Sequence, residues 1–538
     1  MSRPVSDAEA EPVAALEAVR PALSVPYTQA LPGARAAVLT RLWRALAHEP
    51  LPWITGRERA YDALVLRLAD GRRLQGPPSD PYATADHVTE VRLDDTPYDR
   101  PAALLAALGV PHGAGFAAEL DAGTASLALS RADREEYADR EDRADRGDRA
   151  DRADRADRDG LDHRDHGHVG PADVPPTPVW AWEQRVVDGH PYHPGCRSRP
   201  GFTVAEQLAY GPEHRPVVRL GLAAVDDREV TGEWPDWLRD GGRVLIPVHP
   251  WQRAHVLDRR LPVTDGPAAR PLMSLRTLAL PGGGPHVKTA LSARLTSSVR
   301  DISPYSVRTA AAVSALVASV AGRTDGLLHV TRTLGAVTTG SPDLAAVLRE
   351  PPERYAGPGE RVLPVAALPA TGLSRSPAWL ADFARLTLTV GLRLLDLGVA
   401  LEAHGQNLLV VLDSATGAPL RLIYRDLADI RISPARMARH GLPAVELTGR
   451  LVTDDPTALR RKLFGSLVAG TLAATAGSHT ALGEALAAAV PDLERTPDLE
   501  VLSRVTLPAK ALTLMRLTPG RTGDLWTALP NPLYERAR

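Results

Sequence analysis

This sequence lacks several features that would each point to a class of protein. It has one cysteine, Cys196, so no disulfide can form within the chain, and a reducing compartment, the cytoplasm, is expected. The first twenty residues carry acidic side chains and no continuous apolar segment, unlike a secretory signal. The longest apolar helical stretch, residues 309–322, is too short to span a bilayer.

An excess of charge of either sign is also missing. The chain has 63 Lys plus Arg against 65 Asp plus Glu, which gives no electrostatic reason to expect nucleic acid or a membrane as a partner. The patterns GxxxxGK[ST] and GxGxxG after a strand are absent, which excludes a P-loop and a Rossmann site. With 538 residues and 44% hydrophobic content, the chain predicts roughly two to four globular domains and a small-molecule substrate.

The densest group of chemically useful side chains surrounds one predicted β-hairpin. Residues 408–412 and 420–424 are apolar and β-prone, and turn-forming residues lie between them, so two antiparallel strands are expected. This pairing would bring Asn407 and Asp426 side by side, as an oxygen-rich pair of the kind that Mg²⁺ and nucleotide phosphates require. The polar residues just before the first strand are Glu402, His404, Gln406 and Asn407.

A second cluster, residues 189–202, reads GHPYHPGCRSRPGF. Prolines restrict the backbone around two imidazoles, and arginines add permanent positive charge, so an anion-binding loop is predicted. The residues expected to contact the anion are His190, His193, Arg197 and Arg199. The basic surroundings would also suit a thiolate nucleophile at Cys196, but no other feature marks a thioester mechanism, and a small buried side chain explains the position equally well.

Hydroxyl and cationic side chains recur between residues 274 and 300. Hydroxyls donate short hydrogen bonds and guanidinium binds planar oxyanions, so this stretch suits a polyphosphate or polycarboxylate. Residues 288–294 predict a strand with Lys288 and Arg294 on one face. Lys510 is a lone cation in a late apolar stretch, for which a structural and a ligand-binding role remain equally open. The polar residues of the stretch are Ser274, Arg276, Thr277, Lys288, Thr296, Ser297, Ser298 and Arg300.

Repeated Asp-Arg pairs set residues 129–172 apart from the rest of the chain. The stretch contains almost nothing to bury, so a disordered linker or insert is expected. Histidines and aspartates at residues 162–168 suit a transition metal in principle, although a solvated linker explains them as well. Upstream, the patterns predict a small α/β or helical domain, and downstream they predict helices at 306–320 and 377–397.

Taken in chain order, these motifs resemble the IucA/IucC family of NRPS-independent siderophore (NIS) synthetases. The carrying segments are HPYHPGCRSRPGF, LIPVHPWQ, SLRTL, the stretch from Lys288 to Arg300, and EAHGQNLLVVLD with the following YRD. The resemblance implies an α/β (α+β) fold of three hand-like parts and a homodimer. The parts are an N-terminal thumb (1–128), fingers with a β-sheet and the ATP and anion motifs (173–370), and a mostly helical palm with the hairpin (371–538).

The same resemblance implies that ATP activates a carboxylate, commonly citrate or a citryl or succinyl derivative, which an amine or alcohol then captures. The catalytic groups would be Lys288, Arg300 and His404. The nucleotide would contact Ser274, Arg276, Thr277, Lys288, Arg300, Gln406, Asn407 and Asp426. The substrates would contact His190, His193, Arg197, Arg199, Thr296, Ser297, Ser298, His404 and Lys510. Mg²⁺ would lie near Glu402 and Asp426.

Two other functions remain open at this point. A kinase-like small-molecule phosphotransferase is one, because a His-Gly, Asn, strand, turn, strand, Asp order also resembles aminoglycoside and choline kinases. It would release ADP, whereas an adenylating synthetase releases AMP and pyrophosphate. The other is a non-catalytic carboxylate- or siderophore-binding protein.

Overall fold

The N-terminal part of the chain packs long helices against a small sheet. The computed structural model describes residues 3–158, 177–226, 228–295, 298–443, 446–521 and 523–536. Trp43 and Phe116 are among the buried side chains that fill this first core. The elements are α1 (Asp7–Val19), α2 (Ser24–His48), β1 (Ile54–Arg59), β2 (Leu64–Leu68), β3 (Arg73–Gly76), β4 (Val91–Leu93), β5 (Thr96–Tyr98), α3 (Pro101–Leu108) and α4 (Gly113–Arg158).

Helix α4 overlaps the segment for which disorder was expected. Leu129, Ser130 and Asp133 are buried in it, and Ser130 donates a hydrogen bond to Glu213, 3.1 Å away. The prediction of a disordered linker from residue 129 is therefore wrong for its first residues, because the apolar face of α4 continues into the start of the repeat. Residues 162–168, the alternative metal site, lie outside the described residues.

The middle part of the chain forms a nine-stranded antiparallel sheet, in the order β7-β16-β17-β12-β11-β10-β6-β9-β8. Helix α8 (Pro304–Ala321) packs on strands β7 and β16, and it confirms the helix predicted at 306–320. The strands are β6 (Val218–Val225), β7 (Glu229–Gly232), β8 (Arg239–Asp240), β9 (Arg243–Val248), β10 (Val263–Pro271), β11 (Thr277–Ala279), β12 (His286–Thr289), β16 (Thr333–Thr338) and β17 (Ala345–Arg349).

The single strand predicted at 288–294 is two strands. Strand β12 ends at Thr289, and β13 (Leu291–Leu295) leaves the large sheet to pair with β14 (Ser298–Arg300). Lys288 and Arg294 therefore belong to different sheets, so the expectation that they share one face is wrong. The last backbone contact with the large sheet is made by Ala290, whose N–H donates to the carbonyl oxygen of Ala345. Beyond Ala290, among the described residues, β13 pairs only with β14 and has no neighbour in the nine-stranded sheet.

The predicted hairpin is confirmed in the C-terminal part. Strands β20 (Leu408–Asp413) and β21 (Pro419–Tyr424) pair antiparallel, with Leu408 opposite Tyr424. Asp413 accepts hydrogen bonds from two backbone N–H groups of the turn, which fixes the reversal. Strands β15 (Leu328–Val330), β21, β20 and β18 (Glu360–Pro364) form a four-stranded sheet. Successive residues of β20 from Leu408 to Leu412 are all buried, so both of its faces are covered.

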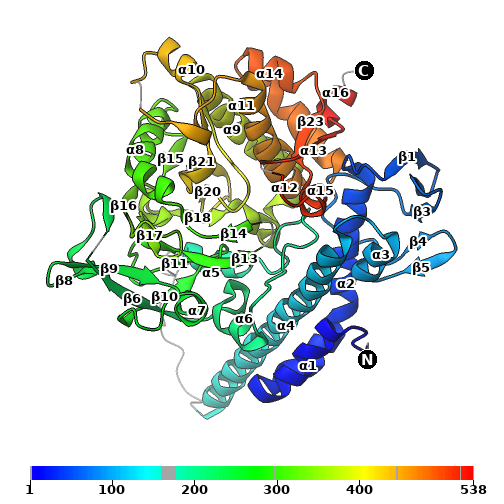
Figure 1. The fold of residues 1–538 in the computed structure, drawn as a ribbon, viewed down its shortest axis with the longest axis horizontal. Helices are drawn as coiled ribbons and strands as arrows, with labels where there is room; N and C mark the ends of the chain where they lie inside the picture. The colour runs from blue at the N-terminus through cyan, green and yellow to red at the C-terminus, as the bar shows by residue number, and fades with distance from the viewer. Residues whose placement is uncertain are drawn as a thin grey trace.

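Helices surround this second sheet, and the last segment of the chain returns to the N-terminal part. Helix α9 (Pro377–Asp396) confirms the helix predicted at 377–397. Figure 1 shows α15 beside α2, where Glu49 accepts hydrogen bonds from the N–H groups of Thr513 (3.1 Å) and Leu514 (2.7 Å). The remaining elements near the site are α11 (Pro456–Leu463), the π-helix η9 (Phe464–Leu472), β23 (Leu507–Lys510), α15 (Leu512–Leu517) and β24 (Trp526–Leu529).

The whole is a mixed α/β fold with predominantly antiparallel sheets, which confirms the expected fold class at that level. In the part of the chain that the structure describes, no helix combines the length and apolar character needed to cross a membrane.

Candidate active site

One cavity of about 1220 Å³ lies where the N-terminal helices, the large sheet and the hairpin sheet meet. Arg300 and Asn407, more than one hundred residues apart in sequence, both line it. Of the predicted site residues, fourteen line this cavity: His190, His193, Arg197, Arg199, Ser274, Arg276, Lys288, Arg300, Glu402, His404, Gln406, Asn407, Asp426 and Lys510.

Four predicted residues are not placed in the cavity wall. Thr277 is buried in β11 and does not line the cavity. Thr296 and Ser297 lie outside the described residues, and Ser298 is described only as part of the backbone of β14. Their predicted roles stay predictions.

Asp426 is the centre of a cationic group. Lys288, on β12, donates to both of its carboxylate oxygens (2.9 and 2.7 Å), and Arg349, on the neighbouring β17, donates to one of them (2.9 Å). Burial opposes ionisation of Asp426, but Arg349 and Lys288 hold its pKa well below the ordinary value. Burial, together with Arg349 and Arg276, lowers the pKa of Lys288 to about 7 despite the attraction of Asp426.

Arg276 connects this group to β14. Its guanidinium donates to the carbonyl oxygens of Arg300 and Asp301, the latter at 2.7 Å, so it fixes the strand that carries Arg300. Burial lowers the pKa of Arg276 to about 10. Ser274 accepts a hydrogen bond from the N–H of Thr277 (3.2 Å) and thereby stabilises the turn that enters β11. The side chains around Asp426 are therefore fixed from several strands at once.

A second charged group surrounds Glu402. Its Oε1 atom accepts from Lys510 (2.9 Å) and Lys462 (3.2 Å), and Lys462 also donates to Asp429 (2.8 Å). Lys510 forms a further ion pair with Asp524 (3.2 Å). Burial disfavours the charge of Glu402, but Lys510 and Lys462 lower its pKa below the ordinary value. Lys510 therefore has an ion-pairing role in this structure.

The π-helix η9 holds the loop between these two groups. Ser466 accepts a hydrogen bond from the N–H of Ala403 (2.9 Å), and Thr471 donates to the carbonyl oxygen of the same residue (2.6 Å). Residues five apart lie about 140° apart around an α-helix, whereas the i→i+5 bonds of a π-helix bring them close to one face. The π-helical geometry thus lets two side chains clamp the residue between Glu402 and His404.

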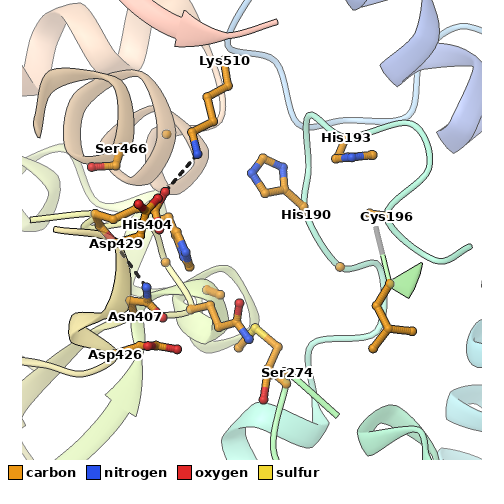
Figure 2. A pocket seen from close by; sticks show the side chains of 18 of the residues that line it. His190, His193, Cys196, Ser274, His404, Asn407, Asp426, Asp429, Ser466 and Lys510 are labelled. Atoms are coloured by element: carbon orange, nitrogen blue, oxygen red, sulfur yellow. Dashed lines mark hydrogen bonds and ion pairs between the residues drawn. The ribbon is translucent and has the colours of Figure 1, made fainter. Parts of the chain in front are cut away.

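His404 and Asn407 complete the wall below this clamp. The Nδ2 atom of Asn407 lies 3.5 Å from the carbonyl oxygen of Glu402. Burial lowers the pKa of His404, so its imidazole is neutral at pH 7. Figure 2 shows His404, Asp426 and Lys510 on one side of the cavity and His190 and His193 on the other.

The two arginines of the predicted anion-binding loop have a protein partner. Arg197 and Arg199 both form ion pairs with the buried carboxylate of Glu213, at 3.2 and 2.6 Å. Burial opposes the charge of Glu213, yet these arginines depress its pKa far below the ordinary value. The geometry therefore supports a structural role for both arginines, and their predicted contact with substrate gains no support from it.

Sequence reasoning missed several charged residues that line the cavity, among them Arg349, Lys462 and Asp429. A signal for Lys462 was present. The chain has only three lysines, Lys288, Lys462 and Lys510, and all three line the cavity. Arg349 ends a buried apolar strand, where a charge needs a partner, so its position was also informative.

Glu402 and Asp426, the predicted Mg²⁺ ligands, do not fit a metal ion in this arrangement. Both oxygens of Asp426 accept hydrogen bonds from cations, and Oε1 of Glu402 accepts from two lysines. Over the described ranges, no cluster of three His, Cys, Asp or Glu side chains could hold an ion. The chemistry derived below therefore uses no metal-bound step.

Two family models match parts of this chain. Residues 178–370 match the model of the IucA / IucC family, and residues 377–524 match the model named ferric iron reductase FhuF-like transporter. Citryl-spermidine/3,4-dihydroxybenzoyl-citryl-spermidine:spermidine ligase of Bacillus anthracis is 27% identical over 311 residues, 45% of this chain and 50% of that protein. Staphyloferrin A synthase of Staphylococcus aureus is 22% identical, over 54% of this chain and 59% of that protein.

The chain spans about half the length of the curated relatives it matches. Among solved structures, petrobactin biosynthesis protein AsbB from Bacillus anthracis has a TM-score of 0.71 at 17% identity and covers 99% of both chains. ATP-bound aerobactin synthetase IucA from Klebsiella pneumoniae has a TM-score of 0.67 at 18% identity, over 93% of this chain and 99% of that one. These likenesses show a shared fold. Residues 178–370 thus resemble the IucA/IucC family, and residues 377–524 form an FhuF-like C-terminal segment.

Proposed function

We propose that this chain is an ATP-dependent synthetase that adenylates a carboxylate, citrate or a citryl or succinyl derivative, and condenses it with an amine or alcohol. The products would be the amide or ester, AMP and pyrophosphate. The observation that carries this proposal is the single cavity in which the cations around Asp426 face the loop of His404 and Asn407. Such a cavity can hold a nucleotide and an acid together.

The first half-reaction needs stabilisation of negative charge. A carboxylate is a weak nucleophile, so the α-phosphate must be made electrophilic and the departing pyrophosphate neutralised. Lys288 and Arg300 are proposed to supply this charge, since Asp426 holds the ammonium of Lys288 and Arg276 holds the backbone of Arg300 before any substrate arrives. Ser274, Arg276, Gln406 and Asn407 line the same wall and are proposed to contact the nucleotide, while Asp426 keeps the cations oriented.

The second half-reaction needs a proton acceptor near the acyl carbon. His404 is proposed for this role, because burial keeps its imidazole neutral and the clamp on Ala403 fixes its backbone. Bringing the acyl adenylate and the amine together supplies much of the remaining acceleration. Ion pairs of Glu402 with Lys462 and Lys510 stabilise the opposite end of this loop.

The architecture proposed with this function has three parts: a thumb, residues 1–128; fingers, residues 173–370; and a palm, residues 371–538. The cavity draws residues from each of them, since Arg41, Lys288 and Asp426 all line it. We also propose a homodimer, which sedimentation of the purified protein would test.

The proposed function is tested by incubating the protein with ATP and either citrate, succinate or α-ketoglutarate, in the presence of hydroxylamine. Adenylation predicts acid-dependent release of pyrophosphate and AMP together with a hydroxamate of the activated acid. A His404→Gln variant should form the hydroxamate poorly while keeping its fold. Production of ADP without pyrophosphate would instead support the phosphotransferase, and no turnover with any acid would support a binding protein.

A further inference from the structure

A buried arginine lies in the cavity wall formed by α2. Arg41 is only 5% exposed and lines the cavity, and its Nη1 atom donates to the sulfur of Cys196 at 2.9 Å. Within the described ranges, no carboxylate forms a hydrogen bond or ion pair with it. Asp188 interacts with Arg41 electrostatically without a hydrogen bond, and one oxygen of its carboxylate is bound by Arg131 at 2.7 Å. A thiol is a weak acceptor, so this guanidinium has no strong acceptor among the described residues.

His193 is a donor without a described acceptor in the same wall. Its side chain is 4% exposed, and Nδ1 accepts a hydrogen bond from the N–H of Gly195 at 3.0 Å. Burial lowers the pKa of His193 to about 3, so the ring is neutral and carries its proton on Nε2. Among the residues that the structure describes, nothing accepts a hydrogen bond from Nε2. Buried donors of this kind normally have an acceptor.

The two donors are held close together by Cys196. Its N–H donates to the carbonyl oxygen of His193 (3.2 Å), and its sulfur contacts Arg41. The adjacent His190 has the same tautomer, because its Nδ1 accepts from the N–H of Tyr192 (3.1 Å). A permanent charge whose described acceptor is only a thiol and a neutral N–H without a described acceptor fit an acceptor-only anion such as a carboxylate. We call Arg41 and His193 the donor pair.

We infer that the donor pair binds a carboxylate of the acceptor substrate, so that the acceptor is an amino or hydroxy acid rather than a polyamine. This inference rests on the proposed function. The acid that is activated must reach Lys288, which is bound by Asp426. Figure 2 shows Asp426 on the opposite side of the cavity from His193, which leaves the wall of the donor pair for the other reactant. There the acceptor amine would attack the acyl carbon, the C–O bond to AMP would break, and the amine proton would pass to His404.

The test compares acceptors that differ only in a carboxylate: L-lysine with cadaverine, and L-ornithine with putrescine. Each is added as a competitor of hydroxylamine in the hydroxamate assay with ATP and citrate, so an inhibition constant is obtained even for a compound that is not condensed. The wild type should bind the carboxylate-bearing member about 10- to 100-fold more tightly. Equal binding, tighter binding of the polyamines, or no inhibition by any of them would overturn the inference.

Variants assign the preference to the donor pair. Arg41→Gln should reduce the preference to less than about threefold, and His193→Phe should reduce it independently if Arg41→Gln does not fold. Arg41→Lys keeps a charge and should retain part of the preference. Arg323→Gln removes an exposed charge outside the cavity and should change nothing.

The assay separates this inference from the function on which it rests. Loss of hydroxamate formation in the wild type would refute the proposed synthetase, whereas normal hydroxamate formation with no preference among acceptors would refute only the acceptor subsite. A rise in the KM for citrate in Arg41→Gln, with the acceptor preference unchanged, would assign the donor pair to the acyl donor and overturn the inference.

Discussion

Replacing Lys288 with methionine tests the electrostatic argument most sharply. Methionine is about as long as the methylene stem of lysine but lacks the ammonium group, so the two hydrogen bonds to Asp426 at 2.9 and 2.7 Å are lost. If Lys288 neutralises the transferring phosphate, kcat for pyrophosphate release should fall about 10²- to 10³-fold, the usual loss for one preorganised charge. The free energy of unfolding should fall by only about 1.5–3 kcal/mol, because Arg349 still binds Asp426 at 2.9 Å.

The pH dependence separates a catalytic charge from a structural one. The pKa of Lys288 is about 7, lowered by burial, so in the free enzyme the ammonium loses its proton as pH rises through that value. We therefore expect kcat/KM to fall above about pH 7 in the wild type. In Lys288→Arg the cation stays protonated, so this alkaline limb should disappear even if the maximal rate is lower.

Initial rates of pyrophosphate release and urea denaturation measure the two effects separately. Unchanged pyrophosphate release in Lys288→Met would refute the assignment of this charge to phosphate transfer. An alkaline limb that persists in Lys288→Arg would show that another group titrates. A loss of activity that matches the loss of folded protein would reduce Lys288 to a structural residue.

Other residues give independent predictions. Glu213→Gln should lower the free energy of unfolding by about 3–5 kcal/mol, measured in urea, because it leaves Arg197 and Arg199 buried without a counter-charge. The pKa of Glu213 is depressed in the folded state, so its contribution is complete above the unfolded pKa of about 4.3 and decreases as pH falls; the stabilities of wild type and variant should converge in acid. Thr471→Val should lower kcat for hydroxamate formation about tenfold with little change in KM for ATP, because Ala403 loses one of its two clamps.

Each of these has a matched control. Thr475 donates to the backbone carbonyl oxygen of Thr471, four residues earlier, and makes no described contact with Ala403, so Thr475→Val should leave kcat unchanged. Thr471→Ser keeps the hydroxyl and should restore most of the rate, whereas equal losses in Thr471→Val and Thr471→Ser would contradict the clamp. Arg385 lies in exposed ion pairs, so Arg385→Gln should cost less than about 1 kcal/mol, and a larger cost would undermine the contrast with Glu213.

Local patterns were enough to predict the elements that carry the site. The hairpin followed from two apolar runs around Asp413, and helix α9 followed from its amphipathic repeat after Ser376, which caps it by accepting from the N–H of Trp379. These features depend on neighbours in sequence, so a single sequence contains them. The convergence of Arg300 and Asn407 on one cavity was also predicted, but only because several motifs recurred in the order of a known family.

Long-range partners were beyond the sequence. Nothing near Arg197 indicates that Glu213 would neutralise it, and nothing near Asp426 indicates Arg349, because these contacts depend on how separate strands and loops pack. The π-helical stretch was equally hidden, since Ser466 and Thr471 become neighbours only when the helix widens. Apolar side chains at the start of the Asp-Arg repeat keep that part of α4 buried. The composition of the whole repeat is polar, so it did not predict this burial.

The central claim is that one cavity holds ATP against a carboxylate and transfers adenylate to it. Citrate labelled with ¹⁸O in its carboxylates tests this directly, because the attacking oxygen stays on the phosphorus when the amine displaces AMP. We predict that AMP gains one ¹⁸O per turnover, as measured by mass spectrometry. Unlabelled AMP, or labelled citrate consumed with ADP as the nucleotide product, would contradict the account.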